Sequence, residues 1–275
     1  MILSQSSLQD FVDCERRFQL RYLLRVAWPA PQAEPQLEHE RRMKQGILFH
    51  RLAHQRMLGI PSEKLDAMQM EPPLDRWWRA HSRTFLPFLA SLGEPLYRYP
   101  EITLMGKMGQ FRLMARYDLL LVQPGERVLI VDWKTGRRPR RPRMAQRVQT
   151  RLYPFLLAQS GAFLNAGRPW EAEQIEMLYW FAEAPTESMR FPYSAAARED
   201  DRQYLNALLE RIAALPTGEL LPPAEDERAC RFCVYRSLCA RGISAAPFAE
   251  REEEAAPEEA PAWEVDFDAI EPVAF

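Results

Sequence analysis

The chain opens with three blocks whose apolar residues recur at helical spacing. The first block, residues 4–26, begins at a capping serine, Ser4 or Ser6, and contains Cys14. A proline-rich segment, residues 28–36, is expected to be a loop that ends this helix, because proline lacks the amide hydrogen that a helix interior needs. The sequence therefore predicts three helices here: at 4–26, from near Glu40 or Gly46 through GILFHRLAHQRM, and at about 74–92.

From residue 97 onward the apolar positions alternate with a period of two, which is typical of strands. The segments EITLM, QFRLMARYDLLLV and RVLIVDW are separated by the turn sequences GKMG and QPGE, so we expect an antiparallel meander. A helix at about 144–165, the strands QIEMLYWFA and SMRFPYS, and a helix at about 196–214 follow. This order predicts an α/β fold with a mixed central sheet flanked by helices.

Composition places the chain among ordinary globular proteins. Of its 275 residues, 47% are hydrophobic and 27% are charged, and no stretch approaches the roughly 18 apolar residues of a membrane span. The N-terminal segment becomes charged too early for a secretory signal, so we expect a cytoplasmic protein without a membrane partner. In that compartment the four cysteines are not expected to form structural disulfides.

The charge is divided unevenly along the chain. The formal net charge is −2, but residues 248–275 carry ten acidic residues and one basic residue, which leaves 35 basic and 28 acidic residues in the rest. We expect one domain at residues 1–246 and an acidic, disordered tail at residues 247–275. The basic body is compatible with a polyanionic partner.

Two carboxylates stand on consecutive predicted strands. Side chains alternate along RVLIVDWK, so Asp132 and Lys134 share one face. On the preceding strand Asp118 is expected to share a face with Arg116 and Leu120, and the hairpin brings it close to Asp132. Two carboxylates in one pocket repel each other unless a divalent cation binds between them. A simple salt bridge between Asp132 and Lys134 is the alternative.

Five motifs follow one another in the order LSQSSLQDFVDCERRF, GILFH, ARYD, VDWKTG and QTRLY. Together they resemble the PD-(D/E)xK nuclease superfamily, in particular its RecB-like branch with an iron-sulfur cluster, which includes CRISPR-associated exonucleases and AddB-type subunits. The resemblance implies a restriction-endonuclease-like fold. Two positions depart from the family pattern, because Ala115 replaces a glycine and Glu15 replaces a proline.

The resemblance also implies roles for single residues. It places catalytic roles on Asp118, Asp132, Lys134, Gln149 and Tyr153. It places a Mg²⁺ or Mn²⁺ ion on His50, Asp118, Asp132 and the main-chain carbonyl of Trp133. Glu101 would be an extra contact, as in some relatives, with a solvent-facing strand residue as the alternative. Read alone, His50 would be a hydrogen-bonded helix histidine, and Gln149 and Tyr153 would be a surface and a core residue.

Seven arginines lie between residues 137 and 151, directly after the Asp-x-Lys strand. Guanidinium groups bind phosphate oxygens in a bidentate manner, whereas an isolated charge run is usually only solvated. Beside a nuclease centre, phosphate contact is the better interpretation. We therefore expect DNA-binding residues at Arg137, Arg138, Arg140 and Arg141.

The cysteines are spaced as C-x2-C-x5-C at Cys230, Cys233 and Cys239, with Cys14 more than 200 residues upstream. A centre bound by all four would join the N-terminal and C-terminal segments of the domain and close a long loop. Ligand count alone also permits a structural zinc site. The family resemblance implies a 4Fe-4S cluster, with zinc as the alternative.

These features predict a Mg²⁺- or Mn²⁺-dependent deoxyribonuclease. The resemblance implies an exonuclease acting on DNA ends or single-stranded DNA in repair, recombination or CRISPR adaptation. Its partners would be DNA and helicase or CRISPR adaptation proteins. The alternative is a DNA-binding or assembly subunit of a helicase-nuclease complex that does not cleave.

Overall fold

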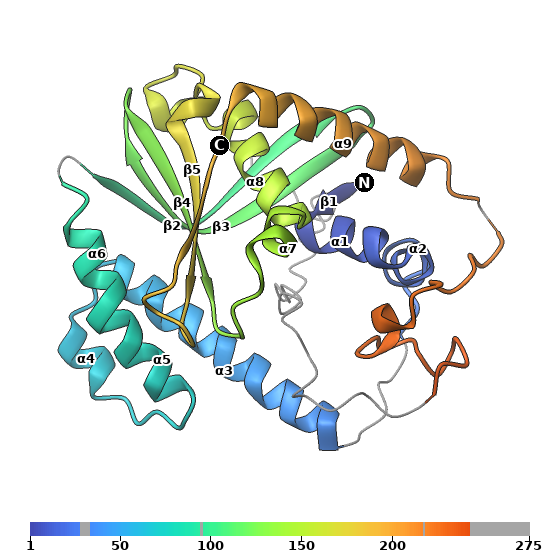
Figure 1. The fold of residues 1–275 in the computed structure, drawn as a ribbon, viewed down its shortest axis with the longest axis horizontal. Helices are drawn as coiled ribbons and strands as arrows, with labels where there is room; N and C mark the ends of the chain where they lie inside the picture. The colour runs from blue at the N-terminus through green and yellow to red at the C-terminus, as the bar shows by residue number, and fades with distance from the viewer. Residues whose placement is uncertain (28–33, 94–95, 217, 243–275) are drawn as a thin grey trace, which may run out of the picture.

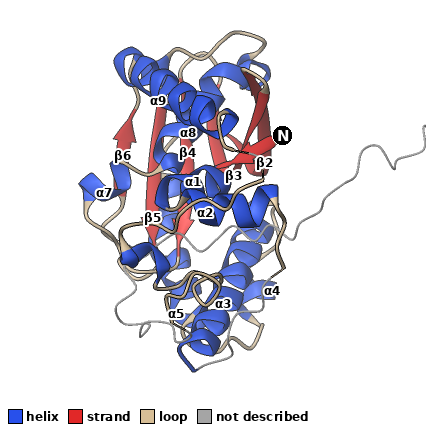
Figure 2. Ribbon diagram, turned by 90° about the vertical axis from the view of Figure 1, so that its right-hand side faces the viewer, coloured by secondary structure: helices blue, strands red, loops and turns tan. Residues whose placement is uncertain are grey.

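The computed structural model describes residues 1–27, 34–93, 96–216 and 218–242. A mixed six-stranded sheet separates two layers of helices (Figures 1 and 2). The predicted acidic tail, residues 247–275, lies outside the described residues. Residues 28–33 of the expected loop also lie outside them. None of the described helices is both long enough and apolar enough to span a membrane.

The sheet is organised around its longest strand, β3. One edge of β3 pairs antiparallel with β2. The other edge is shared, because β1 runs parallel to residues 112–114 and β4 pairs antiparallel with residues 119–123. β5 then runs parallel to β4, and β6 pairs antiparallel with β5. The strands are β1 (Ile2–Ser4), β2 (Tyr97–Met108), β3 (Phe111–Gln123), β4 (Arg127–Lys134), β5 (Ile175–Phe181) and β6 (Met189–Pro192).

The helices fall into two groups, and Figure 1 shows α4, α5 and α6 gathered near α3, apart from α1, α8 and α9. In the chain, α1 and α2 follow the N-terminal strand, α3 to α6 come next and precede the meander, and α7 to α9 follow the meander. The helices are α1 (Gln5–Asp13), α2 (Glu15–Phe18), α3 (Glu34–Met57), α4 (Ser62–Asp66), α5 (Leu74–Ala80), α6 (Leu86–Ala90), α7 (Arg141–Ala145), α8 (Val148–Ser160) and α9 (Ala195–Ala213), with π turns at Gln19–Leu23 and His81–Phe85.

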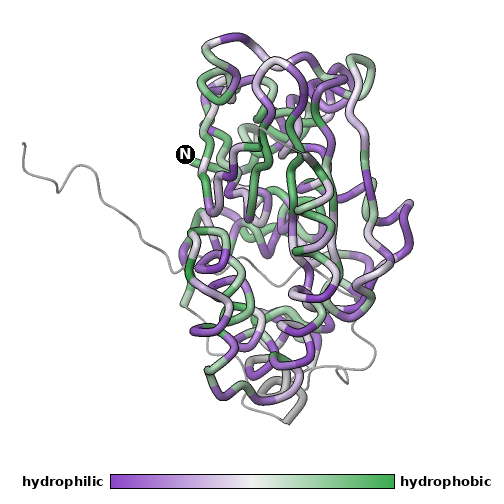
Figure 3. The backbone as a smooth tube through the Cα atoms, turned by 90° about the vertical axis from the view of Figure 1, so that its left-hand side faces the viewer, coloured by the Kyte–Doolittle hydropathy of each residue, from purple (hydrophilic) through white to green (hydrophobic). Residues whose placement is uncertain are grey.

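Each face of the sheet carries its own hydrophobic core. The first core lies between the sheet and α1, α8 and α9, and the second lies between the sheet and α3, α5 and α6. β4 is buried from Val128 to Trp133, because it is covered on both faces. Figure 3 shows hydrophobic colour along the strands and hydrophilic colour in the outer turns. The predicted meander and the mixed sheet are confirmed.

The predicted helix at 4–26 is divided. Ser4 caps α1 and exchanges hydrogen bonds with Ser7 in a capping box. Cys14 then adopts an extended conformation, φ −164° and ψ 108°, and its Sγ accepts a hydrogen bond from the Arg17 amide, so that it caps α2. The expectation of Cys14 inside a continuous helix was therefore wrong, because its side chain ends one helix and starts another.

Two other boundaries also differ from the expected ones. α3 begins at Glu34, inside the expected loop, which fits the tolerance of helix first turns for proline. The helix expected at 144–165 is two helices, α7 and α8, with separate N-cap residues at Arg140 and Arg147. The short elements β1 and α4 were not predicted, because three to five residues show no periodicity.

Candidate active site

β3 and β4 separate at one point in the sheet. Their last paired residues are Leu119 and Val131, so the next opposed residues would be Asp118 and Asp132. Beyond this point β4 stays paired with β5, while β3 continues alongside β1 and β2. The Trp133 amide donates to Oδ2 of Asp118 at 2.8 Å. A carboxylate thus takes the place of a ladder carbonyl where the strands part.

The ladder between β2 and β3 is interrupted at the same level. Pro100 pairs with Leu119 and Ile102 with Tyr117, but no pair forms between Glu101 and Asp118. Glu101 has a φ of +55°, a left-handed conformation that is uncommon for a residue other than glycine. Backbone outliers of this kind often occur at functional sites.

The interruption changes which side chains share a face of β3. Tyr117 and Leu120 are three residues apart, yet both lie in the first core. Regular alternation would place them on opposite faces. The expectation that Asp118 shares a face with Leu120 was therefore wrong. The side chain of Arg116, two residues before Asp118, does share its face.

His50, Glu101 and Asp118 form a group with the dimensions of a metal site. One ligand atom from each lies within 4.8 Å of the others, and all three residues are partly exposed. His50 Nδ1 is 3.3 Å from Oδ1 of Asp118. Among the described residues no other group of three or more histidine, cysteine, aspartate or glutamate side chains is as compact. The two carboxylates of this group are the kind of ligand that Mg²⁺ and Mn²⁺ prefer.

Gly46 allows α3 to bring His50 to this group. A Cβ atom at residue 46 would lie 3.1 Å from Oγ1 of Thr135, which follows the Asp-x-Lys strand. Gly46 and His50 are four residues apart and therefore lie on one face of the helix. The glycine is needed for a close approach between α3 and the end of β4.

Asp132 faces a second cluster, built with Lys134 and Gln149. Lys134 Nζ lies 2.7 Å from Oδ1 of Asp132 and donates to Oε1 of Gln149 at 3.0 Å. The Gln149 amide nitrogen donates to the other Asp132 oxygen. Asp132 and Gln149 are 3% and 2% exposed, so α8 holds this network in a nearly dry environment.

Burial and mutual charge set the protonation of the two clusters. Burial raises the pKa of Asp132 to about 6, and the charge of Asp118 adds to this, although Lys134 opposes it. Burial also raises the pKa of Asp118, but the charge and hydrogen bond of His50 outweigh it and lower the pKa below its usual value. Burial lowers the pKa of His50 and of Lys134, but the neighbouring carboxylates raise both above their usual values.

These residues fit a divalent cation. Oδ1 of Asp132 is fully buried and receives no hydrogen bond of normal geometry, and it faces the Lys134 ammonium in an ion pair. The ligand group nevertheless differs from the expected one. Glu101 joins His50 and Asp118, while Asp132 turns toward Lys134 and Gln149. The ligand role expected for the main-chain carbonyl of Trp133 stays a prediction.

Sequence reasoning missed Arg116, which binds the Glu101 carboxylate through Nε and its terminal nitrogen. Its two-residue spacing from Asp118 could have indicated it, because the two side chains share a strand face.

Tyr153 lies in the core. Its side chain is 0% exposed, and its ring centroid is 4.9 Å from that of Tyr117. The Tyr117 hydroxyl donates to the Tyr153 carbonyl at 2.9 Å. A direct contact between Tyr153 and a large substrate is incompatible with this burial, so a catalytic role would act through the position of α8.

The arginine-rich loop is fastened to the β5–β6 hairpin. Arg138 donates to the Glu187 carbonyl at 2.8 Å, and Arg141 donates to the Arg190 carbonyl at 2.6 Å. Arg141 also lies over the Phe191 ring, 4.5 Å from its centroid. All four proposed DNA-binding arginines are exposed, including Arg137 and Arg140. Two of them thus already hold the loop to the protein.

The N-terminal helices and the C-terminal segment contact each other directly. The Gln19 side chain donates to the Glu219 carbonyl at 2.7 Å, and the Tyr235 hydroxyl donates to the Val26 carbonyl at 3.0 Å. Burial and then the charge of Cys14 raise the pKa of Cys230, so these two thiols are electrostatic neighbours. Within the described residues the four thiols form no group compact enough for a single ion.

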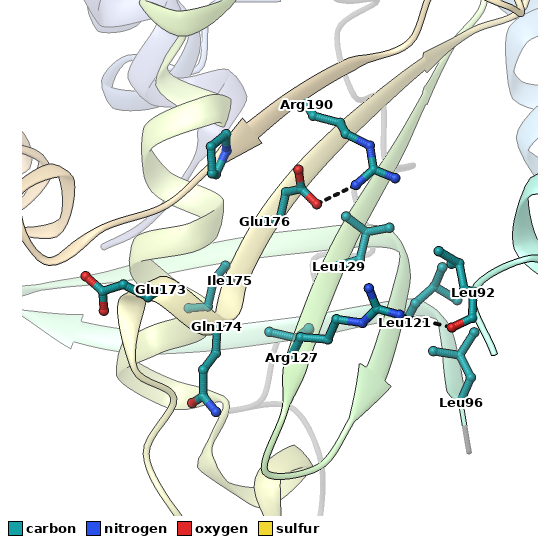
Figure 4. Close-up of a pocket in the computed structure, with 12 residues that line it drawn as sticks. Leu92, Leu96, Leu121, Arg127, Leu129, Glu173, Gln174, Ile175, Glu176 and Arg190 are labelled. Atoms are coloured by element: carbon teal, nitrogen blue, oxygen red, sulfur yellow. Dashed lines mark hydrogen bonds and ion pairs between the residues drawn. The ribbon is translucent and has the colours of Figure 1, made fainter. Parts of the chain in front are cut away.

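A pocket of about 290 Å³ lies at the opposite end of the sheet (Figure 4). It includes Leu121, Leu129, Arg190 and Glu176, and the last two form an ion pair at 2.6 Å. Arg127, where β4 begins, also lines it, whereas Asp132 and Lys134 stand where β4 ends. This pocket is separate from the candidate active site.

A family model described as the PD-(D/E)XK nuclease superfamily matches residues 2–240. No curated protein matches the sequence. Among solved structures, a candidate exonuclease from Eubacterium rectale shares 10% identity over 92% of this chain and 90% of its own, with a TM-score of 0.53. SSO0001 shares 13% identity over 86% and 85%, with a TM-score of 0.42. LHK-Exo, solved with dAMP, shares 13% identity over 77% and 88%, with a TM-score of 0.32.

Proposed function

The chain belongs to the PD-(D/E)XK nuclease superfamily, whose members use divalent metals, and from this premise we propose that it is a Mg²⁺- or Mn²⁺-dependent deoxyribonuclease. The observation that supports the proposal best is the convergence of His50, Glu101 and Asp118 at the point where β3 and β4 separate. The Asp132–Lys134 pair stands beside them on β4.

His50, Glu101 and Asp118 would hold the ion, and Asp132 on β4 is a further carboxylate beside them. When bound, the ion supplies a Lewis acid for the scissile phosphate and lowers the pKa of a coordinated water. His50 binds in its neutral form, so it must first give up any proton that it shares with Asp118.

Lys134 supplies a fixed positive charge. Its raised pKa keeps the amine protonated at neutral pH, in spite of burial. A preorganised ammonium in a nearly dry site stabilises the negative charge that develops on the phosphate in the transition state. Asp132 and Gln149 hold that ammonium in place through the contacts described above.

We propose an exonuclease of the RecB-like branch, acting on DNA ends or single-stranded DNA. The fold neighbour from Eubacterium rectale is described as a candidate exonuclease, which agrees with this mode of attack. The arginine-rich loop after β4 supports a polyanionic substrate, because Arg137 and Arg140 are exposed beside Lys134 in the chain. The proposed setting is DNA repair, recombination or CRISPR adaptation in the cytoplasm, with a helicase or adaptation protein as partner.

The test compares linear and circular DNA, each single-stranded and double-stranded, with Mn²⁺, Mg²⁺ or chelator. We expect metal-dependent loss of linear strands and intact circles. Asp132→Ala should abolish cleavage and retain DNA binding. A wild-type protein that leaves all four substrates intact would defeat the enzyme proposal, and DNA binding without cleavage would favour a subunit that does not cleave.

We also propose that Cys14, Cys230, Cys233 and Cys239 hold a 4Fe-4S cluster within one domain at residues 1–246, with a structural zinc ion as the alternative. Support comes from the chain contacts between the two cysteine-bearing segments and from the thiol chemistry of the set. The test is anaerobic purification with iron and zinc analysis. Iron with broad visible absorbance supports the cluster, and colourless protein with stoichiometric zinc contradicts it.

A further inference from the structure

One face of the β1–β2–β3 part of the sheet is mostly exposed beyond the end where α3 approaches β2 and β3. Its inward residues, such as Leu3, Leu104 and Leu113, are buried in the first core. Its outward residues alternate with them, and most of these are exposed. We call this surface the outer sheet face; its residues are Ile2 and Ser4 from β1, Thr103, Met105 and Lys107 from β2, and Arg112, Met114 and Arg116 from β3.

The outer sheet face is basic. It carries Lys107, Arg112 and Arg116 and no acidic residue, and Glu101 stands at its end. Within the described part of the chain, the side chains of Lys107 and Arg112 contact no acidic group, whereas Arg116 binds Glu101. Unpaired positive charges on an open surface attract a polyanion.

This surface is continuous with the candidate active site. Asp118, Arg116 and Arg112 are separated by even numbers of residues along β3, so their side chains lie on one face of the strand. The outer sheet face therefore begins at the metal group. At roughly 3.3 Å per residue, Arg112 lies about 20 Å along the strand from Asp118. Lys107 is the cross-strand partner of Arg112, so two cations stand together at the far end.

Apolar side chains fill the space between the cations. Met105 and Met114 are cross-strand partners between Arg116 and the Lys107–Arg112 pair, and Ile2 lies beside Arg112. Ile2 and Met105 are 46% and 42% exposed. Thioether and aliphatic groups can pack against nucleobases, while flanking cations bind phosphates.

We infer that the outer sheet face is a binding track for a single nucleic acid strand that leads to the site at Asp118. This inference rests on the proposed function. It differs from the arginine-rich loop, which follows β4 and contacts the β5–β6 hairpin. Lys107 and Arg112 bind phosphates, and the methionine pair supports the bases between them.

The experiment reverses the two distal charges, with the double variant Lys107→Glu and Arg112→Glu in the full-length protein. The matched control is Lys64→Glu with Arg83→Glu, which makes the same charge change at exposed positions in the helices beside α3. Binding of a fluorescent 20-nucleotide DNA strand is measured by anisotropy at several salt concentrations in an Asp118→Asn background. Hydrolysis of bis(p-nitrophenyl) phosphate is measured in the wild-type background.

We expect the Lys107 and Arg112 variant to weaken DNA binding about tenfold and to reduce the salt slope by about one or more, because two phosphate contacts are lost. The control should bind as before, and both variants should hydrolyse the small ester normally. Unchanged or tighter DNA binding by the Lys107 and Arg112 variant overturns the inference, even if the wild type cleaves DNA. A wild type that cleaves neither DNA nor bis(p-nitrophenyl) phosphate overturns the proposed function instead.

Discussion

The Trp133 amide donates a hydrogen bond to the Asp118 carboxylate at the point where β3 and β4 part. This contact gives Asp118 a structural role in addition to its candidate role as metal ligand. A buried amide without an acceptor costs free energy, and the Asp118 side chain removes that cost where no ladder carbonyl is available.

We expect the two roles of Asp118 to separate by mutation. Asp118→Asn keeps an oxygen that can accept the Trp133 amide, whereas Asp118→Ala removes it. Both variants should lose nuclease activity, but only Asp118→Ala should be destabilised, by about 1–3 kcal/mol relative to Asp118→Asn. Urea unfolding monitored by circular dichroism measures the difference. Equal stabilities would show that the Trp133 contact contributes little.

Gly46 is predicted to set the distance between α3 and the end of β4. Gly46→Ala places a methyl group 3.1 Å from Thr135 Oγ1, so the helix or the loop must shift and carry His50 with it. We expect activity to fall about tenfold, because small displacements of catalytic groups are costly. The double variant with Thr135→Ala should recover most of this loss, since it removes the contacting oxygen. Additive losses in the double variant would contradict this explanation.

Gln149 and Tyr153 are predicted to behave differently, although both belong to one motif. Gln149 contacts Asp132 and Lys134, so Gln149→Leu should lower kcat by about 100-fold and change KM little, because it disturbs charge stabilisation in the transition state. Tyr153→Phe retains the ring against Tyr117 and should keep most activity. A loss of kcat from Tyr153→Phe as large as that from Gln149→Leu would show that the tyrosine hydroxyl acts in catalysis.

Arg138 and Arg140 offer a similar contrast in the loop after β4. Arg138 is bound to Glu187, so Arg138→Ala should loosen the loop and reduce both thermal stability and DNA affinity. Arg140→Ala should reduce DNA affinity alone, with a smaller salt slope, because the exposed Arg140 side chain does not fasten the loop to another described residue. Equal effects of both substitutions on stability would contradict the anchoring role of Arg138.

The sequence predicted those parts of the fold and site that depend on periodicity. Alternation on RVLIVDWK correctly placed Asp132 beside Lys134, and the four-residue hairpin sequence set Asp118 opposite Asp132. These predictions succeeded because each follows from a regular backbone that extends over several residues.

The amino-acid sequence did not predict the places where the backbone departs from regular geometry. At the left-handed Glu101 and the unpaired Asp118 the alternation of side chains between the two sheet faces is offset by one residue. No local residue pattern predicts such an offset. The break at Cys14 was missed for a similar reason, because a capping thiol looks like any other residue within an apolar helical pattern. The sequence named His50, Glu101 and Asp118, but their convergence where the strands part, away from the Asp132–Lys134–Gln149 cluster, was visible only in the structure.

The protonation of Asp132 predicts how pH and metal act together on stability. Its folded-state pKa is about 6, above the ordinary 3.8, and burial is the main cause. The folded protein therefore binds more protons at this group than the unfolded chain does between these pH values. By linkage, the contribution of Asp132 to the stability of the metal-free protein falls as pH rises from about 4 to about 6, and it stays low above that window.

A divalent ion favours the ionised carboxylate and the neutral imidazole, so its stabilising effect should grow over the same rise in pH. We expect added Mn²⁺ to raise Tm only slightly near pH 5 and clearly at about pH 7.5. Asp132→Asn should flatten the part of the metal-free pH profile that depends on Asp132. Calorimetric melts with Mn²⁺ and with chelator provide the measurement. A rise in Tm that is independent of pH would mean that the ion binds away from these coupled groups.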